Sequence, residues 1–124
     1  MKFLENIPIY VQIANDIKDQ VVAGKLADGD KLLSLREYSL AYEVTALTMQ
    51  RALGLLELED VVETKKGVGS FVKAGTQAQL KVRSIDALVQ EFMARAANMG
   101  LSKVEILDRV REAIHQGGTE HGDN

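Results

Sequence analysis

The sequence predicts a mainly α-helical fold with one small β-hairpin, arranged as a winged helix-turn-helix followed by a two-helix hairpin. Three observations support this prediction. Apolar residues recur at helical spacing ahead of Gly24, two helix starts follow each other closely at Ser34 and Thr45, and two β-prone runs flank the glycines Gly67 and Gly69. Helix, helix-turn-helix and hairpin follow one another in the order of a winged helix.

The first helix is predicted to start near Pro8, because the first helical turn tolerates proline. Its apolar stripe continues until Gly24 and consists of Tyr10, Ile13, Ala14, Ile17 and Val21. Residues 27–30 have the composition of a turn, and residues 31–33 form a short extended stretch.

Two capping residues define the next two helices. Ser34 and Glu37 fit a capping box, in which the hydroxyl accepts from the amide of Glu37 and the carboxylate from the amide of Ser34. This second helix can extend only to about Ala41 or Tyr42, because Thr45 offers another N-cap. A third helix over about residues 46–59 turns Met49, Ala52, Leu53 and Leu56 inward.

A hairpin follows, with strands expected at residues 61–64 and 70–73. Between them, Lys65-Lys66-Gly67-Val68-Gly69 supplies glycines for the positive φ angles of the turn. A phosphate-binding loop is a poor interpretation of these glycines, since no helix follows to supply an amide cluster.

Beyond about Gln77 a new apolar stripe covers about four helical turns and ends at Gly100. A second capping box, Ser102 to Glu105, starts a last helix with an apolar side of its own. The domains are therefore expected at residues 1–75 for the winged helix-turn-helix and 76–116 for the helical extension, with a disordered tail at 117–124.

The composition excludes several classes of function. The 124 residues contain no cysteine, which excludes disulfides, thiolate metal sites and a cysteine nucleophile. The two histidines, His115 and His121, lie in or beside the polar tail, so no metal site and no cofactor is predicted. No signal peptide or membrane span is evident, which makes the cytoplasm the expected location. No acid-base pair accompanies a nucleophile, so an enzyme is not expected.

Bulk charge does not favour a nucleic-acid partner. The net charge is -3, and residues 1–74 hold nine lysines and arginines against eleven aspartates and glutamates. Because lysine and arginine supply much of the affinity for phosphates, any basic surface must come from local placement.

Residues 8–72 resemble the DNA-binding domain of the GntR family of bacterial regulators. The matching residues include Pro8-Ile9-Tyr10, Gly24-Lys25-Leu26, Gly29-Asp30-Lys31-Leu32, Ser34, Arg36-Glu37, Thr48, Gln50-Arg51-Ala52, Leu56-Glu57 and Glu63-Thr64 with residues 65–72. The short helical extension resembles that of the YtrA subfamily, in which this part serves dimerisation. The resemblance implies a homodimeric transcription regulator, expected to repress, with double-stranded DNA as partner and no membrane; no small-molecule effector is identified.

Several residues depart from the family pattern. Leu33 stands where the family has proline, and Glu43 and Asp60 stand where it has glycine. At the last two positions the departure implies either a changed backbone or strain. Ala46 and Leu47 replace polar residues at the start of the third helix, which implies a changed target sequence.

The resemblance implies that DNA is contacted by the N-terminal part of the third helix, by the start of the second helix and by the wing. The candidates are Ser34, Arg36, Thr45, Ala46, Leu47, Thr48, Gln50, Arg51, Lys65, Lys66, Gly67 and Gly69.

Each candidate also has an ordinary structural interpretation. Thr45 is first of all an N-cap, with phosphate contact secondary. Arg51 can pair with Glu57 or Glu43, Arg36 can be a solvated surface residue, and the wing lysines can belong to a flexible turn. The family match favours DNA contact for the arginines and lysines.

The C-terminal stripes are expected to be a subunit interface rather than core packed against the winged helix, because two helices cannot bury both apolar faces on each other. The candidate dimerisation residues are Ile85, Leu88, Val89, Phe92, Met93, Ala96, Met99, Leu107, Val110 and Ile114. The alternative to a DNA-binding dimer is a winged-helix module that binds proteins, suggested by the acidic balance and by Ala46-Leu47.

Overall fold

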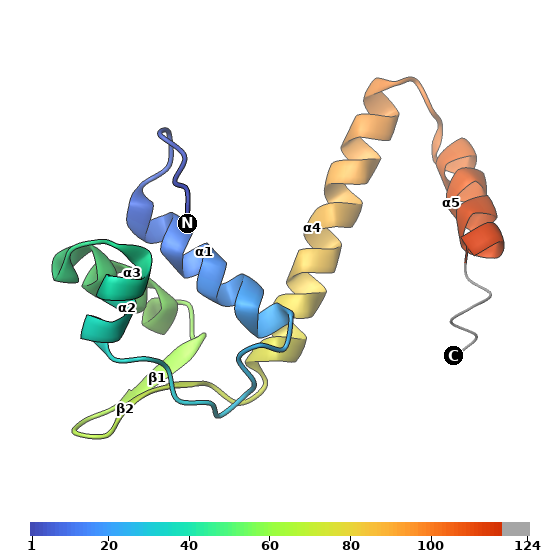
Figure 1. Cartoon of the computed structure of the whole chain (residues 1–124). Coiled ribbons are helices and arrows are strands. Elements are labelled where there is room, and N and C mark those ends of the chain that lie inside the picture. The colour runs from blue at the N-terminus through green and yellow to red at the C-terminus, as the bar shows by residue number, and fades with distance from the viewer. Residues whose placement is uncertain (118–124) are drawn as a thin grey trace. The chain divides into compact units, whose positions relative to one another are not determined.

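The computed structural model describes residues 1–117 and confirms the mainly helical architecture with one hairpin (Figure 1). The predicted tail at 117–124 lies outside the described residues except for Gly117, which is the last residue of α5. The elements are α1 (Ile9–Val22), α2 (Leu35–Tyr42), α3 (Ala46–Leu58), β1 (Val62–Lys65), β2 (Gly69–Val72), α4 (Thr76–Asn98) and α5 (Lys103–Gly117).

The described chain forms two compact units. The first covers Met1–Val82 and contains the winged helix-turn-helix together with the first turns of α4. The second begins at Arg83 and contains the rest of α4 and α5. The boundary between the units therefore falls within a continuous helix, not in a loop.

The core of the first unit lies between α1 and α3. Ile13, Ile17 and Val21 of α1 are fully buried, as are Met49 and Leu56 of α3. Removing such side chains from water contributes roughly 1.5–3 kcal/mol each. The core continues into Val61, Val62 and Val72 of the hairpin region, so the hairpin is attached to the helices through its valines.

The hairpin is antiparallel, with Val62 opposite Val72 and Lys65 opposite Gly69. Each strand is shifted by one residue from its expected bounds, toward the turn. Val61 stays outside β1 because its amide closes the end of α3, donating to the carbonyl of Leu56 at 2.9 Å. The predicted extended stretch near residue 31 forms a single antiparallel bridge, from Lys31 to Phe71, and so pairs with β2 of the wing at one position.

Two non-glycine residues occupy the left-handed region. Glu43, the residue that ends α2, has φ 57° and ψ 49°, and Asp60 after α3 has φ 60°. Both turns therefore keep the left-handed backbone that glycine would adopt, and the Cβ atoms of Glu43 and Asp60 make it strained. Of the two possibilities that the sequence left open, a changed backbone or strain, the structure shows strain.

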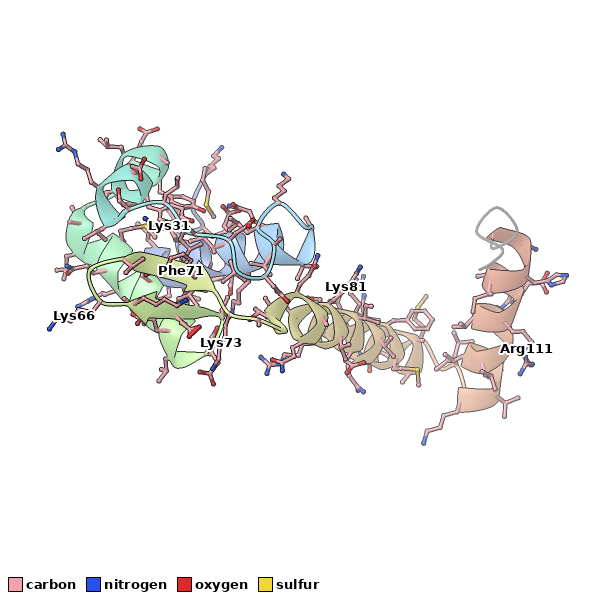
Figure 2. The ribbon with its side chains drawn as sticks, turned by 90° about the horizontal axis from the view of Figure 1, so that it is seen from below. Lys31, Lys66, Phe71, Lys73, Lys81 and Arg111 are labelled. Atoms are coloured by element: carbon pink, nitrogen blue, oxygen red, sulfur yellow. The ribbon has the colours of Figure 1, made fainter. Side chains whose placement is uncertain are left out.

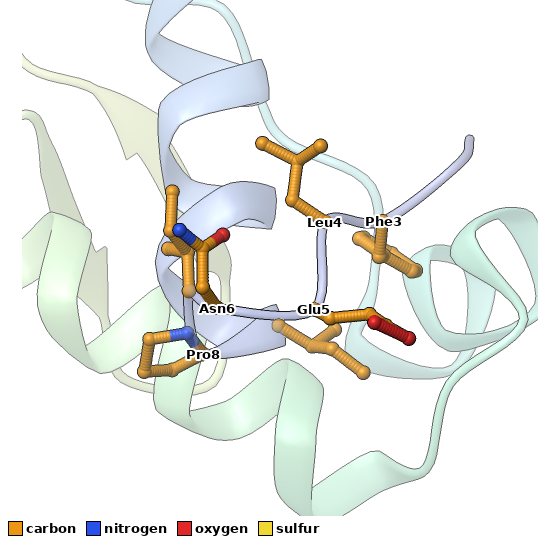
Figure 3. Close-up of a pocket in the computed structure, with 7 residues that line it drawn as sticks. Phe3, Leu4, Glu5, Asn6 and Pro8 are labelled. Carbon is orange, nitrogen blue, oxygen red and sulfur yellow. The ribbon is translucent and has the colours of Figure 1, made fainter.

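The N-terminal segment is anchored to α1 by one buried amide. The Gln12 side chain accepts from the amide of Leu4 at 2.8 Å and donates to the carbonyls of Leu4 and Ile7 at 2.9 and 2.7 Å. Figure 3 shows the pocket that this segment forms, where Glu5 and Asn6 are the only polar side chains among the lining residues. Its lining is therefore mainly apolar.

The second unit has few buried side chains. Among its described residues only Ala96 and Ile106 are buried, each at 4% exposure. Its last helix starts as predicted, with Ser102 and Glu105 forming a reciprocal capping box at 3.2 and 2.9 Å. Met93 and Val110 are half-buried, and the other large apolar side chains on the helices of this unit are exposed.

Replacing Glu43 by glycine should stabilise the protein, because glycine adopts a positive φ without steric cost. We expect the free energy of unfolding to rise by about 1 kcal/mol, the strain relieved less the entropy that glycine adds to the unfolded chain. Chemical denaturation measures the change. Glu57→Gly, within α3, is the control and should lower stability by about 1 kcal/mol. An E43G variant no more stable than the parent would contradict the prediction, because the strain at Glu43 would then not exceed the entropy that glycine adds to the unfolded chain.

Candidate nucleic-acid interface

The outer face of α3 carries most of the predicted contact residues. Ala46, Leu47, Gln50 and Arg51 are exposed, while Met49 and Ala52 on the opposite side of the helix are buried. Positions 47, 50 and 51 share one side of a helix, since residues three and four apart are neighbours. One apolar side chain, one amide and one guanidinium therefore point outward together, with Leu47 at 61% exposure.

The start of α3 is fixed by Thr45, as predicted. Its Oγ1 accepts from the amide of Thr48 at 3.2 Å and donates to the Thr48 hydroxyl at 3.1 Å. Thr48 is half-buried. The capping bond satisfies one of the amides that a helix start leaves without a partner, and it orders the turn from which Leu47 projects.

The start of α2 is fixed by Ser34 in the predicted capping box. The Ser34 hydroxyl accepts from the amide of Glu37 at 3.1 Å, and the Glu37 carboxylate accepts from the amide of Ser34 at 2.9 Å. The bond from the Ser34 amide to the carboxylate, with the Ser34 hydroxyl as a second cause, lowers the pKa of Glu37 below its usual range. Arg36 is exposed between the two capping residues, so the box orders the helix turn that carries this arginine.

The turn between α2 and α3 is tied to α1 by a side-chain network. The Tyr42 hydroxyl donates to the Asp16 carboxylate at 2.7 Å, and the Gln20 amide donates to both groups at 3.2 Å. Burial, with the Asp16 carboxylate as a further cause, raises the pKa of Tyr42. Since Tyr42 directly precedes Glu43, the network positions the turn that leads into α3.

The wing presents its basic residues on an ordered hairpin (Figure 2). The Lys65 ammonium lies 4.9 Å from the centroid of the Phe71 ring, a cation–π contact that restrains this side chain. Gly69 has φ +140°, and the Cε of Lys31 lies 2.7 Å from where a Cβ on residue 69 would stand. The positive φ favours glycine at 69, whereas the flexible end of the exposed Lys31 side chain can move aside for a Cβ.

The predicted contact cations form no ion pair in the part of the chain that the structure describes. Within residues 1–117 the carboxylates of Glu59 and Asp60 are paired, with Lys18 at 2.7 Å and with Lys73 at 3.4 Å. The predicted contact cations, Arg36, Arg51, Lys65 and Lys66, have no carboxylate within 4 Å in that part of the chain. The intrahelical and cross-turn pairs considered for Arg51 are thus absent there, and these four cations are available to phosphates.

The sequence analysis missed three features around this surface: Lys31 at the wing, the Asp16–Tyr42 bond and Gly54 on α3. Lys31 reaches the wing only through its bridge to Phe71, a pairing between residues 40 positions apart that no local pattern encodes. The Asp16–Tyr42 bond likewise joins two helices. Gly54 lies on the outer face of α3 with no atom within 4 Å of a Cβ position, so internal packing does not require glycine there. A glycine inside a helix is a signal that sequence analysis can detect.

Most of the predicted dimerisation residues form an exposed apolar face on the second unit. Ala96 is buried, and Met93 and Val110 are half-buried. The exposed members are Ile85, Leu88, Val89, Phe92, Met99, Leu107 and Ile114. Phe92 borders two apolar hollows, one with Leu88 and Met99 on α4 and its end, the other with Val110 and Ile114 on α5.

The described residues offer little for other chemistry. Residues 1–117 contain no group of three or more histidines, aspartates and glutamates placed to hold a metal ion. His115 lies on α5, and His121 lies outside the described residues. None of the helices between residues 1 and 117 combines the length and the apolar character that a bilayer crossing requires.

Two capped helices followed by a basic wing are the arrangement of a DNA-binding winged helix-turn-helix, and comparison with known proteins assigns the family. Residues 9–72 match the bacterial regulatory proteins of the gntR family. The chain belongs to that family. It is a helix-turn-helix transcription regulator that binds DNA, and the resemblance inferred from sequence is confirmed.

Individual relatives support this assignment over nearly the whole chain. The HTH-type transcriptional regulator YhcF of Bacillus subtilis (strain 168) is 34% identical over 119 residues, which cover 94% of this chain and 98% of YhcF. The HTH-type transcriptional repressor YtrA of the same strain is 27% identical over 108 residues, covering 85% and 83% of the two chains.

A solved structure extends the likeness to the fold. A GntR family transcriptional regulator from Listeria monocytogenes superposes with a TM-score of 0.77 at 32% identity, over 89% of this chain and 98% of that one. These relatives are named regulators rather than enzymes, and none of the three supports the alternative of a protein-binding module.

Proposed function

We propose that the protein is a homodimeric repressor without enzymatic activity that binds a pseudo-palindromic operator. The observation that carries this proposal is the set of unpaired cations around an exposed face of α3. In a helix-turn-helix the N-terminal part of the recognition helix enters the major groove. Here α3 is that helix, and YtrA, a repressor by name, is similar along most of the chain.

The outer face of α3 supports a mixed mode of base recognition. Arg51 can pair with guanine or phosphate and Gln50 with adenine, whereas Ala46 and Leu47 can contact only apolar groups such as a thymine methyl. The operator is therefore expected to place thymines opposite the start of α3. Thr45 and Thr48 serve the helix start first and phosphates second.

The remaining candidates contact the DNA backbone. Arg36 and the ordered start of α2 flank α3, while Lys65 and Lys66 follow the wing to the adjacent phosphates or minor groove. The glycines Gly67 and Gly69 give the turn of the wing its positive φ angles, and Val68 between them is exposed at the tip. Ser34 contributes by capping α2 and by lying beside Arg36.

Dimerisation is supported by the apolar face of the second unit. An exposed face of this extent is unusual for a protein that stays monomeric, and the second unit, in which only Ala96 and Ile106 are buried among the described residues, has little core of its own. Closing two copies around a two-fold axis would cover the face on both. Two recognition helices would then meet half-sites about one helical turn, roughly 10 bp, apart.

Removing the unpaired cations should weaken operator binding without unfolding the protein. We expect Arg51→Ala to raise Kd by roughly 5- to 100-fold on the preferred site, and Lys65→Ala with Lys66→Ala to lower the salt slope by about one unit for each phosphate that is no longer neutralised. Fluorescence anisotropy on a duplex selected from random DNA, at several salt concentrations, measures both. Arg83→Ala, an exposed arginine on α4, is the control with unchanged Kd; unaltered binding in R51A, R36A and the double wing variant would refute the proposal.

Placing a charge on the apolar face should separate the subunits. We expect Phe92→Asp to weaken self-association by at least about tenfold, because an unpaired buried carboxylate costs several kcal/mol. Sedimentation equilibrium measures the dissociation constant. Gln90→Asp adds the same charge on α4 away from the stripe and should leave the dimer intact. A Phe92→Asp variant that dimerises like the parent would exclude this face as the interface.

A further inference from the structure

The carboxylate of Asp28 reaches from the loop after α1 to the start of α4. Its Oδ2 accepts from the amide of Gly75 at 2.8 Å, and its Oδ1 accepts from the amide of Gln77 at 3.1 Å. The first amides of a helix have no partner within the helix, and negative charge is favoured at that end. Asp28 therefore caps α4 from a loop that lies almost fifty residues earlier in the chain.

Other contacts hold the same first turn of α4 on the winged helix. Thr76 is 4% exposed, and its hydroxyl donates to the carbonyl of Val61 at 3.5 Å. Leu80, one turn further on, is 7% exposed and belongs to the core of the first unit. Gly75 before the helix has φ +85°, a conformation that suits glycine. The start of α4 is thus built into the winged-helix body.

The loop that carries Asp28 is itself bound to the wing. The amide of Gly29 donates to the carbonyl of Val72 at 2.8 Å, and the amide of Val72 donates to the carbonyl of Asp30 at 2.9 Å. The Asp30 carboxylate closes the turn by accepting from the amide of Ala27 at 2.8 Å. One short loop therefore contacts β2 through its backbone and α4 through the Asp28 side chain.

We propose that Asp28 is a positioning residue for DNA recognition, which sets the direction in which α4 leaves the winged helix and thereby the half-site spacing that the dimer accepts. The inference rests on the proposed homodimeric function. The apolar stripe from Ile85 onward lies on the same continuous helix as the turn that Asp28 caps. Any change of angle at Thr76 is therefore carried along α4 to the interface.

The length of the helix makes small angles matter. From Thr76 to Phe92 the rise is about 24 Å at roughly 1.5 Å per residue. A swing of about 15° at the first turn displaces Phe92 by about 6 Å, which is about the length of two base-pair steps at roughly 3.4 Å each. Losing the two Asp28 bonds should therefore widen the range of accepted half-site spacings by one or two base pairs.

Operators of altered spacing test the proposal. Duplexes carry the two half-sites of a selected operator with their centres moved by one or two base pairs, and Kd is measured for each with the full chain. We expect the parent to lose at least about tenfold in affinity at two base pairs, and Asp28→Ala to lose only about two- to threefold. The salt slope should not change, because the proposed role of Asp28 involves no phosphate. An Asp28→Ala profile as sharp as that of the parent overturns the proposal.

Two further variants make the outcome specific to this side chain. Asp28→Asn keeps the shape and one acceptor, and is expected to give an intermediate profile; it serves as the test if the alanine variant does not fold by circular dichroism. Asp19→Asn removes an equal charge from an exposed position on α1 and should keep the parent's profile.

A measurement without DNA separates this proposal from the proposed function. The chain has no cysteine, so Asn15→Cys on α1 provides a single spin-labelling site per subunit. Pulsed electron resonance on the dimer should give a narrow distance distribution that broadens in Asp28→Ala; an unchanged distribution overturns the role of Asp28 alone. A parent that forms no dimer, or binds single and paired half-sites equally, contradicts the proposed function and this inference with it.

Discussion

The packing of α1 against α3 is the interaction on which the rest of the first unit depends. Ile13, Ile17 and Val21 meet Met49 and Leu56 in a core from which water is excluded. Burying one face of α3 in this way fixes which residues point outward, since the helical period leaves 47, 50 and 51 on the opposite side. The outward face is therefore a consequence of the core, and the caps at Ser34 and Thr45 and the Tyr42 network only adjust its position.

Local charge placement explains how a chain of net charge -3 can bind DNA. Acidic side chains near the end of α3 are neutralised by Lys18 and Lys73, while Arg51 and Lys66 on the outer surface have no carboxylate partner within residues 1–117. Because screening limits the reach of charges to about 8–10 Å at ordinary salt, the nearby cations matter more than the sum over the chain. The net charge of the whole chain is therefore a poor guide to whether this protein binds DNA.

The sequence predicted the helices, their caps and the hairpin because these depend on neighbours in the chain. The capping boxes at Ser34 and Ser102 are local features of this kind, whereas the sequence left open whether the backbone at Glu43 is changed or strained. It did not predict Lys31 beneath the wing or Asp28 at the start of α4, since both contacts join segments some 40 to 50 residues apart. The DNA-contact and dimerisation residues stay predictions, because a free surface shows availability and not its partner.

The central claim is that two recognition helices of one dimer occupy successive major grooves on the same side of an operator. Hydroxyl-radical footprinting with the full chain, on a duplex selected from random DNA, tests it most directly. We expect two protected windows on one face of the duplex, about one helical turn or roughly 10 bp apart. A single protected window would contradict the claim. So would protection that unrelated competitor DNA removes as effectively as the selected duplex does.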